Sequence, residues 1–459
     1  MSRAAAYRNT RGLPPHRWQF FVAASGYLAL AVYGSLVPLT YQALDWNEAL
    51  ARFAEIRYLN LGIESRSDWV ANILLFIPLA WLAMGTLCVD RGAVWAGLCA
   101  LAVALACHAL SWSIEFVQLF FPPRTVSVND VVAETIGGAI GCVLWLVTGQ
   151  AITNWCRRIL ALNRNTSAVP LILPAYLLVL AVIHLMPLDL TISPVEVYHK
   201  LKGGKVLVLP FTQVDQGWEF VQDTLWNMAY FAPLGYLLAT LCLPDGRPRF
   251  TLAQIAVIGL LTTAAIEAMQ LFVFTRTSDT TDIVTGAVAA LVAATVVRRS
   301  RPVTGRAGAS GVLGWLLPVV WCGALASLYW WPFNFTTAAL PEANGVPLPL
   351  WRARRIPWLP FEDYYWQSEY ASFDQVLQKG ISFAVLGILL AVGWRVRWAW
   401  LAVVIALLVA GAIELGQFCL VNHYPSVTDV LIETLGAWCG FSLWQRWRQP
   451  QLAAMAVSK

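Results

Sequence analysis

Residues 111–141 read SWSIEFVQLFFPPRTVSVNDVVAETIGGAIG, and this stretch joins the end of one apolar segment to the start of the next. It carries Glu115, Gln118 and Asp130, with Gln three residues after Glu and Asp twelve residues after Gln. The same three residues recur at the same spacing twice more, as Glu267, Gln270 and Asp282 and as Glu414, Gln417 and Asp429. Ionisable side chains inside apolar segments are costly, so three copies at one spacing indicate a duplicated polar site.

The composition indicates that these apolar segments lie in a membrane. Charged residues make up 12% of the chain and hydrophobic residues 58%, whereas soluble domains have about 25% and 45–50%. Apolar runs recur at the roughly 20 residues that a membrane-spanning helix needs. We therefore predict an all-α, polytopic membrane protein with about 12 transmembrane helices in three four-helix repeats. The predicted spans lie near residues 18–38, 68–88, 93–120, 128–149, 169–187, 222–243, 250–274, 280–298, 311–333, 373–395, 397–421 and 427–446.

Alignment on the Glu, Gln and Asp residues divides the chain into units of about 150 residues. We assign residues 1–160 to repeat 1, residues 161–305 to repeat 2 and residues 306–459 to a degenerate repeat 3. The first span of each repeat ends in a proline, at Pro38, Pro187 and Pro332. A Leu-Pro-Phe tripeptide follows in repeats 2 and 3, ending at Phe211 and Phe361. Small residues four apart in the fourth span, such as Gly137 and Gly141, predict close helix packing.

The second span contributes a further polar pair. Asp68 and Asn72 in repeat 1, like Asp223 and Asn227 in repeat 2, are four residues apart and share one helix face. In repeat 3 the pattern is blurred, because Asp374 leads to Gln378 or, after a one-residue slip, to Lys379.

These polar residues are expected to meet at one membrane depth. Glu and Gln share a face at the end of the third span, and Asp opens the fourth. A loop residue lies six positions after each Gln, namely Arg124, Arg276 and His423. A second carboxylate follows Asp by four residues as Glu134 and Glu433, whereas repeat 2 has Gly286 there. Three helices would thus bring carboxylates, amides and an arginine to one outer-leaflet pocket in each of repeats 1 and 2. Glu414, Gln417, Asp429 and Glu433 of repeat 3 are the weaker candidates.

The basic residues predict the orientation. With the N-terminus in the cytoplasm, most of the 31 Lys and Arg residues fall on the cytoplasmic side, among them Arg91, Arg157, Arg158, Arg298 and Arg299. Because Lys and Arg in short loops set the topology, we predict a multi-pass protein with both termini in the cytoplasm.

The residues Asn72-Ile-Leu-Leu-Phe76-Ile-Pro78-Leu79, Glu115-x-x-Gln118, Arg124, and Asp130 followed by a glycine pair resemble the VanZ-like family of bacterial membrane proteins. Repeat 2 adds the Leu-Pro-Phe element and a Pro-Leu-Gly turn, and repeat 3 matches at Glu414, Gln417, Asp429, Glu433 and Gly436. The resemblance implies a protein of the bacterial inner membrane and the cell envelope. The family is named for a protein that confers resistance to the glycopeptide teicoplanin, so glycopeptide resistance is the implied physiological setting.

Three functions remain open. The first is binding or modulation of an envelope component, such as a lipid-linked glycan intermediate or a glycopeptide, at the outer-leaflet pockets, with the lipid bilayer as the other partner. The second is a membrane-embedded enzyme that uses paired carboxylates on a lipid-linked substrate, with Glu115 or Glu267 as base. The third is a transporter, although transporter sites usually lie near the midplane.

A structural explanation stands beside all three functions. Glu, Gln, Arg and Asp could simply pair with one another and tie the helices together. The nine cysteines are scattered without a CxxC pair, no metal-ligand cluster is present, and no Ser, Cys or His recurs as a nucleophile. We therefore expect no metal, no cofactor and no nucleic-acid partner.

Overall fold

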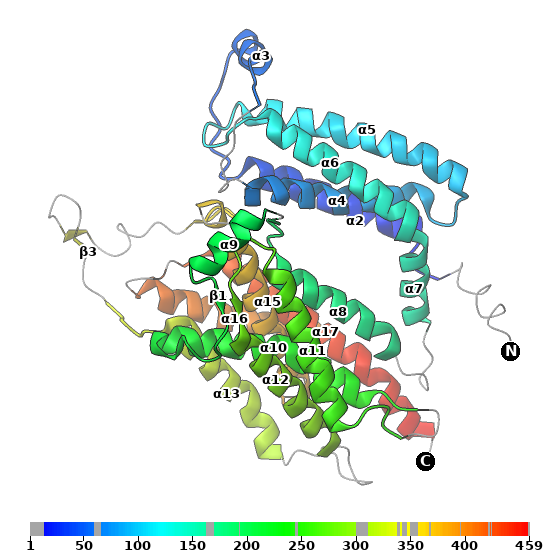
Figure 1. The fold of residues 1–459 in the computed structure, drawn as a ribbon, viewed down its shortest axis with the longest axis vertical. Coiled ribbons are helices and arrows are strands. Elements are labelled where there is room, and N and C mark those ends of the chain that lie inside the picture. Colours follow the sequence, from blue (N-terminus) through cyan, green and yellow to red (C-terminus); the bar gives the residue numbers. More distant parts are fainter. Residues whose placement is uncertain are drawn as a thin grey trace. The chain divides into compact units, whose positions relative to one another are not determined.

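The computed structural model describes residues 13–58, 66–161, 169–191, 193–243, 247–299, 311–336, 340–341, 347–348, 357–366, 369–394, 396–420, 423 and 425–457. Residues 1–304 form one compact unit and residues 305–459 form another, and each is described by itself. Long helices dominate both units (Figure 1). The strands of the described residues are two residues long and lie in the connections: β1 (Val206–Leu207), β2 (Ser278–Asp279), β3 (Leu340–Pro341) and β4 (Pro347–Leu348). The prediction of a helical fold is confirmed.

Repeat 1 is built on four helices that run side by side (Figure 1). They are α2 (Arg17–Leu36), α4 (Arg66–Cys88), α5 (Ala93–Gln118) and α6 (Val128–Leu144). The short α3 (Trp46–Ala54) lies in the connection between α2 and α4, where the Asp45 carboxylate caps it by accepting the Asn47 N–H at 3.0 Å. Beyond α6 the helix continues through a π-helical turn (Trp145–Gly149) into α7 (Gln150–Leu160). Phe20, Phe76, Met84 and Trp145 belong to the apolar core between these helices.

Repeats 2 and 3 repeat this order. Repeat 2 contains α8 (Val169–Leu185), α9 (Pro194–Lys202), a 3-10 turn (Val214–Gln216), α10 (Trp218–Thr240), α11 (Leu252–Gln270) and α12 (Thr280–Arg299). Repeat 3 contains α13 (Gly311–Trp330), a 3-10 turn (Tyr364–Trp366), α15 (Glu369–Val392), α16 (Ala399–Phe418) and α17 (Val427–Val457). β1 pairs with β2 in parallel, which places the long loop of repeat 2 beside the start of α12. β3 pairs with β4 in antiparallel fashion.

Each of the predicted spans coincides with a helix, and eight of the helices in the described ranges are long and apolar enough to cross a membrane. The eight are Arg17–Leu36, Arg66–Cys88, Ala93–Gln118, Val128–Leu160, Leu252–Gln270, Thr280–Arg299, Ala371–Val392 and Ala399–Phe418. Residues 169–185 and 315–330 form shorter apolar helices. The protein is therefore a helical membrane protein, and the number of twelve spans stays a prediction.

The second and fourth helices of each repeat make the most extensive contacts, and small residues allow this. A Cβ atom at Gly137 or Gly141 of α6 would lie 2.2 Å from Ile73 O or 2.4 Å from Ile77 O of α4. Repeat 3 uses the same face, since a Cβ at Gly440 of α17 would lie 2.0 Å from a backbone oxygen of α15. In repeat 2 the glycine is on the second helix instead, at Gly235 of α10. The predicted close approach of the helices is confirmed.

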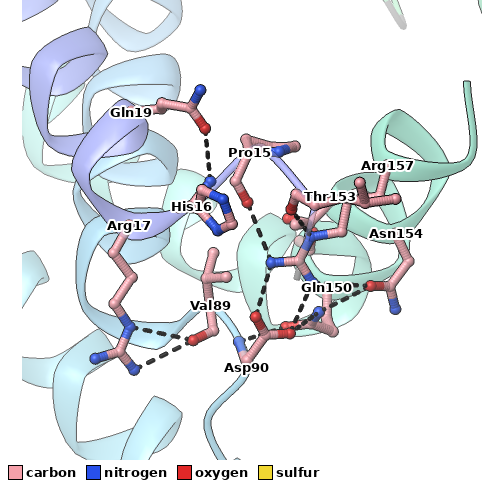
Figure 2. Close-up of polar contacts among 12 residues, drawn as sticks. Pro15, His16, Arg17, Gln19, Val89, Asp90, Gln150, Thr153, Asn154 and Arg157 are labelled. Atoms are coloured by element: carbon pink, nitrogen blue, oxygen red, sulfur yellow. Dashed lines mark hydrogen bonds and ion pairs between the residues drawn. The ribbon is translucent and has the colours of Figure 1, made fainter. Parts of the chain in front are cut away.

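A separate polar cluster lies past the C-terminal end of α4, at the opposite end of that helix from Asn72 (Figure 2). The Arg157 side chain of α7 is 0% exposed, and its guanidinium makes two hydrogen bonds to the Asp90 carboxylate, at 2.8 and 2.7 Å. It also donates to the backbone oxygens of Leu13 at 3.0 Å and Pro15 at 3.1 Å. Gln150 donates to the same carboxylate at 3.1 Å. The buried arginine therefore joins the segment before α2, the α4–α5 turn and α7.

Candidate functional site

The repeated glutamate receives the same backbone hydrogen bond in each repeat. One carboxylate oxygen accepts the N–H of the residue twelve positions later, immediately before the fourth helix. The pairs are Ser127 N to Glu115 Oε2 at 2.8 Å, Asp279 N to Glu267 Oε2 at 2.9 Å, and Ser426 N to Glu414 Oε2 at 2.7 Å. Each glutamate is buried. Because the start of a helix has unpaired N–H groups and a partial positive charge, the carboxylate is stabilised there.

The repeated glutamine has a different structural role. Its side-chain amide donates to a backbone oxygen in the last turn of the first helix, three residues before the proline. The pairs are Gln118 Nε2 to Ser35 O at 2.8 Å, Gln270 Nε2 to His184 O at 3.0 Å, and Gln417 Nε2 to Tyr329 O at 3.3 Å. The glutamine thus ties the third helix to the first in all three repeats. This part of the pattern is a helix–helix contact.

The aspartate and the asparagine of the second helix meet in repeat 1. Asn72 Nδ2 donates to Asp130 Oδ1 at 2.7 Å, and the Ser127 hydroxyl donates to Asp130 Oδ2 at 2.9 Å. In repeat 2 Asn227 Nδ2 instead donates to the backbone oxygen of Asp282 at 2.9 Å and to the Thr285 hydroxyl at 2.7 Å. The expected contact between the second and fourth helices is present in both, but only in repeat 1 does it reach the carboxylate.

Repeat 3 places a lysine where the other repeats have asparagine. Lys379 of α15 lies four residues before the fully buried Phe383, as Asn72 lies four residues before Phe76. The Lys379 ammonium forms an ion pair with Asp429 and lies 5.8 Å from the centre of the Tyr329 ring. Of the two possible alignments, the structure selects Lys379. Gln378 donates to Asp374 Oδ2 at 2.7 Å within the same helix.

Tyr364 adds a second donor to the repeat 3 site. Its hydroxyl donates to Asp429 Oδ1 at 2.8 Å from the 3-10 turn before α15. The Leu-Pro-Phe element positions this turn, because Phe361 N donates to the Thr428 hydroxyl at 2.7 Å. Repeat 2 has the same contact between Phe211 N and the Thr281 hydroxyl at 2.9 Å. The tripeptide is therefore held against the first turn of the fourth helix.

The second carboxylate is buried with incomplete hydrogen bonding. Glu134 is 3% exposed, and its Oε2 atom has no hydrogen-bond partner within the described part of the chain. Glu433 of repeat 3 is fully buried, and both of its carboxylate oxygens likewise lack a donor there. In repeat 2 there is no room for such a side chain, since a Cβ at Gly286 would lie 2.4 Å from Thr263 Cγ2.

The loop arginines point to the first helix. Arg276 donates to the backbone oxygens of Met186 and Ile183, both at 2.8 Å, and Arg124 donates to Gly34 O at 3.4 Å. These contacts satisfy carbonyl groups at a helix C-terminus, where a cation is favourable. Asp68 and Asp223, one turn before the asparagines, are exposed at the rim of the site. Glu115, Asp130 and Glu134, like Glu267 and Asp282, lie in the third and fourth helices near their junction, and their role in ligand binding stays a prediction.

Lys200 of α9 was not found from the sequence. It is 3% exposed and donates from Nζ to Gln270 O at 2.5 Å and Val273 O at 2.8 Å. Burial, and then the neighbouring Lys205, lower its pKa to about 8, although Asp189 and Glu267 act in the opposite direction. Neither of the other repeats carries an equivalent lysine, so no repetition signals its role.

The site offers carboxylates and amides. Within the described ranges no three His, Cys, Asp or Glu side chains come together as a metal site. All nine cysteines are free thiols. The arrangement suits recognition of a donor-rich or positively charged group.

These features define a helical membrane protein of tandem repeats, each with a buried polar junction. A model of the VanZ/LLP1 family matches the chain three times, at residues 22–149, 173–301 and 318–448. The chain therefore belongs to the VanZ/LLP1 family and contains three tandem VanZ-like units. No curated protein and no solved structure matches it. The boundaries at residues 160 and 305 stay a prediction.

Proposed function

We infer that this protein binds or modulates a component of the bacterial cell envelope through the polar junction of repeat 1. The protein lies in the inner membrane with both termini in the cytoplasm, so the junction faces the outer leaflet. Its ligand is a membrane-borne molecule such as a lipid-linked glycan intermediate, and glycopeptide resistance is the physiological setting. The junction of repeat 2 is a second candidate site with one carboxylate fewer.

The buried oxygen of Glu134 carries this proposal. A buried polar atom without a hydrogen bond costs about 1–3 kcal/mol, and more when it is charged. The fold does not remove this cost, although Ser111 lies near the carboxylate and its own hydroxyl is also unpaired. Glu115 and Gln118, by contrast, are held by hydrogen bonds that serve the fold. Asp130 accepts hydrogen bonds from Asn72 and Ser127, so Glu134 is the carboxylate of repeat 1 with an oxygen that remains for a ligand.

The test compares molecules that copurify with the wild type and with Glu134→Gln. Glutamine keeps the size of the side chain and removes its charge. We expect mass spectrometry to find an envelope lipid with the wild type that is depleted in Glu134→Gln. Glu48→Gln, on the exposed face of α3, is the matched control and should retain that lipid.

A cellular readout accompanies the copurification. Expression of the wild type should change sensitivity to a glycopeptide, and Glu134→Gln should abolish that change at equal protein level. Recovery of only bulk phospholipid in equal amounts from all variants, together with unchanged sensitivity, would contradict the proposal.

A further inference from the structure

Repeat 3 holds its own cation among the repeated carboxylates. Lys379 is 8% exposed, and its ammonium pairs with Asp429 next to Tyr329. Glu414 and Glu433 act on this ammonium electrostatically, although neither Glu433 oxygen accepts a hydrogen bond from it. An ammonium group in such a place is stabilised by surrounding negative charge and by the face of an aromatic ring.

Repeat 1 has the same carboxylates without the lysine. Glu115, Asp130 and Glu134 stand at the positions of Glu414, Asp429 and Glu433 in repeat 3. Asn72, a neutral amide, stands at the position of Lys379. Glu134 Oε2 has no hydrogen-bond donor in the part of the chain that the structure describes. In repeat 3 these carboxylates lie around an ammonium group. In repeat 1 the donors that the second and fourth helices supply are neutral.

We propose that repeat 1 binds a primary ammonium group of a membrane amphiphile, at the position that the Lys379 ammonium takes in repeat 3. This inference rests on the proposed function, because it names the chemistry of the ligand at the same site. A primary ammonium is compact and has three N–H donors, which suit the Asp130 carboxylate and the unpaired Glu134 Oε2. A quaternary ammonium has no N–H donor and could not form a hydrogen bond with either carboxylate.

The polar residues of this site become more buried from its rim to its interior. Asp68 is exposed, Asn72 and Asp130 are half-buried, and Glu134 is buried, so negative groups lead from the rim of the site to its interior. Repeat 2 is not expected to share this ligand, because Gly286 replaces the second carboxylate. The proposal therefore assigns one ammonium site to the wild-type chain, in repeat 1.

Two sources of the ammonium are distinguished by two pairs of probes added to the full-length protein in detergent. The first pair is phosphatidylethanolamine and phosphatidylcholine, which differ by methylation of the amine. The second pair is a lipid-linked glycan precursor with a free amine and the same molecule with its amine acetylated. Native mass spectrometry reports the bound equivalents and the affinity. We expect the free amine to bind at least tenfold more tightly in one of the two pairs, and that pair identifies the source.

Exchange of Asn72 and Lys379 between repeats 1 and 3 tests where the ammonium group binds. Asn72→Lys should weaken binding of the preferred probe at least tenfold, because the new ammonium takes the place of the ligand. Asn47→Lys, the same change at an exposed position of α3, should leave binding unchanged. Lys379→Asn should add a second bound equivalent in repeat 3. Melting curves establish that each variant is folded, and the comparison of probes on the wild type needs no variant.

The outcomes separate this inference from the proposed function. Equal binding of both members of each pair would overturn the inference, as would unchanged binding in folded Asn72→Lys. If binding depends on Glu134 but not on the amine, the inference fails and the proposed function stands. If binding depends on neither, both fail.

Discussion

Repeats 1 and 3 present the same carboxylates at the same junction of helices, but they neutralise them differently. In repeat 3 Lys379 and Tyr364 supply donors to Asp429 from within the chain, whereas both oxygens of Glu433 lack a donor among the described residues. In repeat 1 Asp130 accepts hydrogen bonds from Asn72 and Ser127, and Glu134 Oε2 has no partner among the described residues. The same polar pattern thus has an internal ammonium in repeat 3 and only neutral donors to Asp130 in repeat 1.

The largest effect is expected from removal of the repeat 3 cation. Lys379→Met should lower the free energy of unfolding by about 3–5 kcal/mol, because it leaves buried carboxylates without their counter-charge. Asn72→Leu in repeat 1 should cost only about 1–3 kcal/mol, the value for a lost neutral donor. Thermal and denaturant unfolding in detergent measure both. Equal losses would show that the repeats do not differ in this way.

A smaller effect of opposite sign is expected at Glu134. Glu134→Gln should raise the free energy of unfolding by about 1–2 kcal/mol, since it replaces a buried acidic group that lacks a partner with a neutral amide. The same variant should lose the copurifying ligand. A gain in stability at the expense of binding is the expected behaviour of a binding residue. If stability and binding fall together, Glu134 has a structural role.

Substitution of the repeated glutamine should lower stability by the same amount in all three repeats. Gln118→Leu, Gln270→Leu and Gln417→Leu should each destabilise the protein by about 1 kcal/mol, because each removes one hydrogen bond between the third and first helices. Melting temperatures of the three variants in one detergent test this expectation. If Gln118→Leu loses the ligand at an unchanged melting temperature, Gln118 belongs to the binding site.

A pH-dependent effect is expected for Lys200, which has no counterpart in the other two repeats. Its pKa is about 8 in the folded protein and about 10.4 in an unfolded chain. Between these values the unfolded state binds more protons, so the free energy of unfolding should rise as the pH increases from about 8 to about 10. Below pH 8 both states are protonated and the contribution is constant. The difference in melting temperature between the wild type and Lys200→Met, followed from pH 7 to pH 10, isolates this dependence. A difference that does not change with pH would contradict it.

The spacing of Glu115, Gln118 and Asp130 was enough to predict the helices that meet and the junction where they do so. It could not assign separate roles to these residues, because the partners of Glu115 and Gln118 are backbone groups, which no residue type reveals. Lys379 was ambiguous since a one-residue slip along α15 turns the side chain by about 100°, and only packing around Phe383 decides between the two alignments. The burial of Lys200 could not be predicted, because it results from a loop that returns to the end of α11. Helical periodicity does not predict such long-range contacts.

The guanidinium of Arg157 has a practical consequence for handling the protein. Its acceptors include the backbone oxygens of Leu13 and Pro15, so those residues are part of the folded structure although they precede the first long helix. An affinity tag or fluorescent reporter joined ahead of residue 13 leaves these acceptors in place. An expression variant shortened to begin at Arg17 would take two acceptors from a fully buried cation, and we expect it to yield little folded protein.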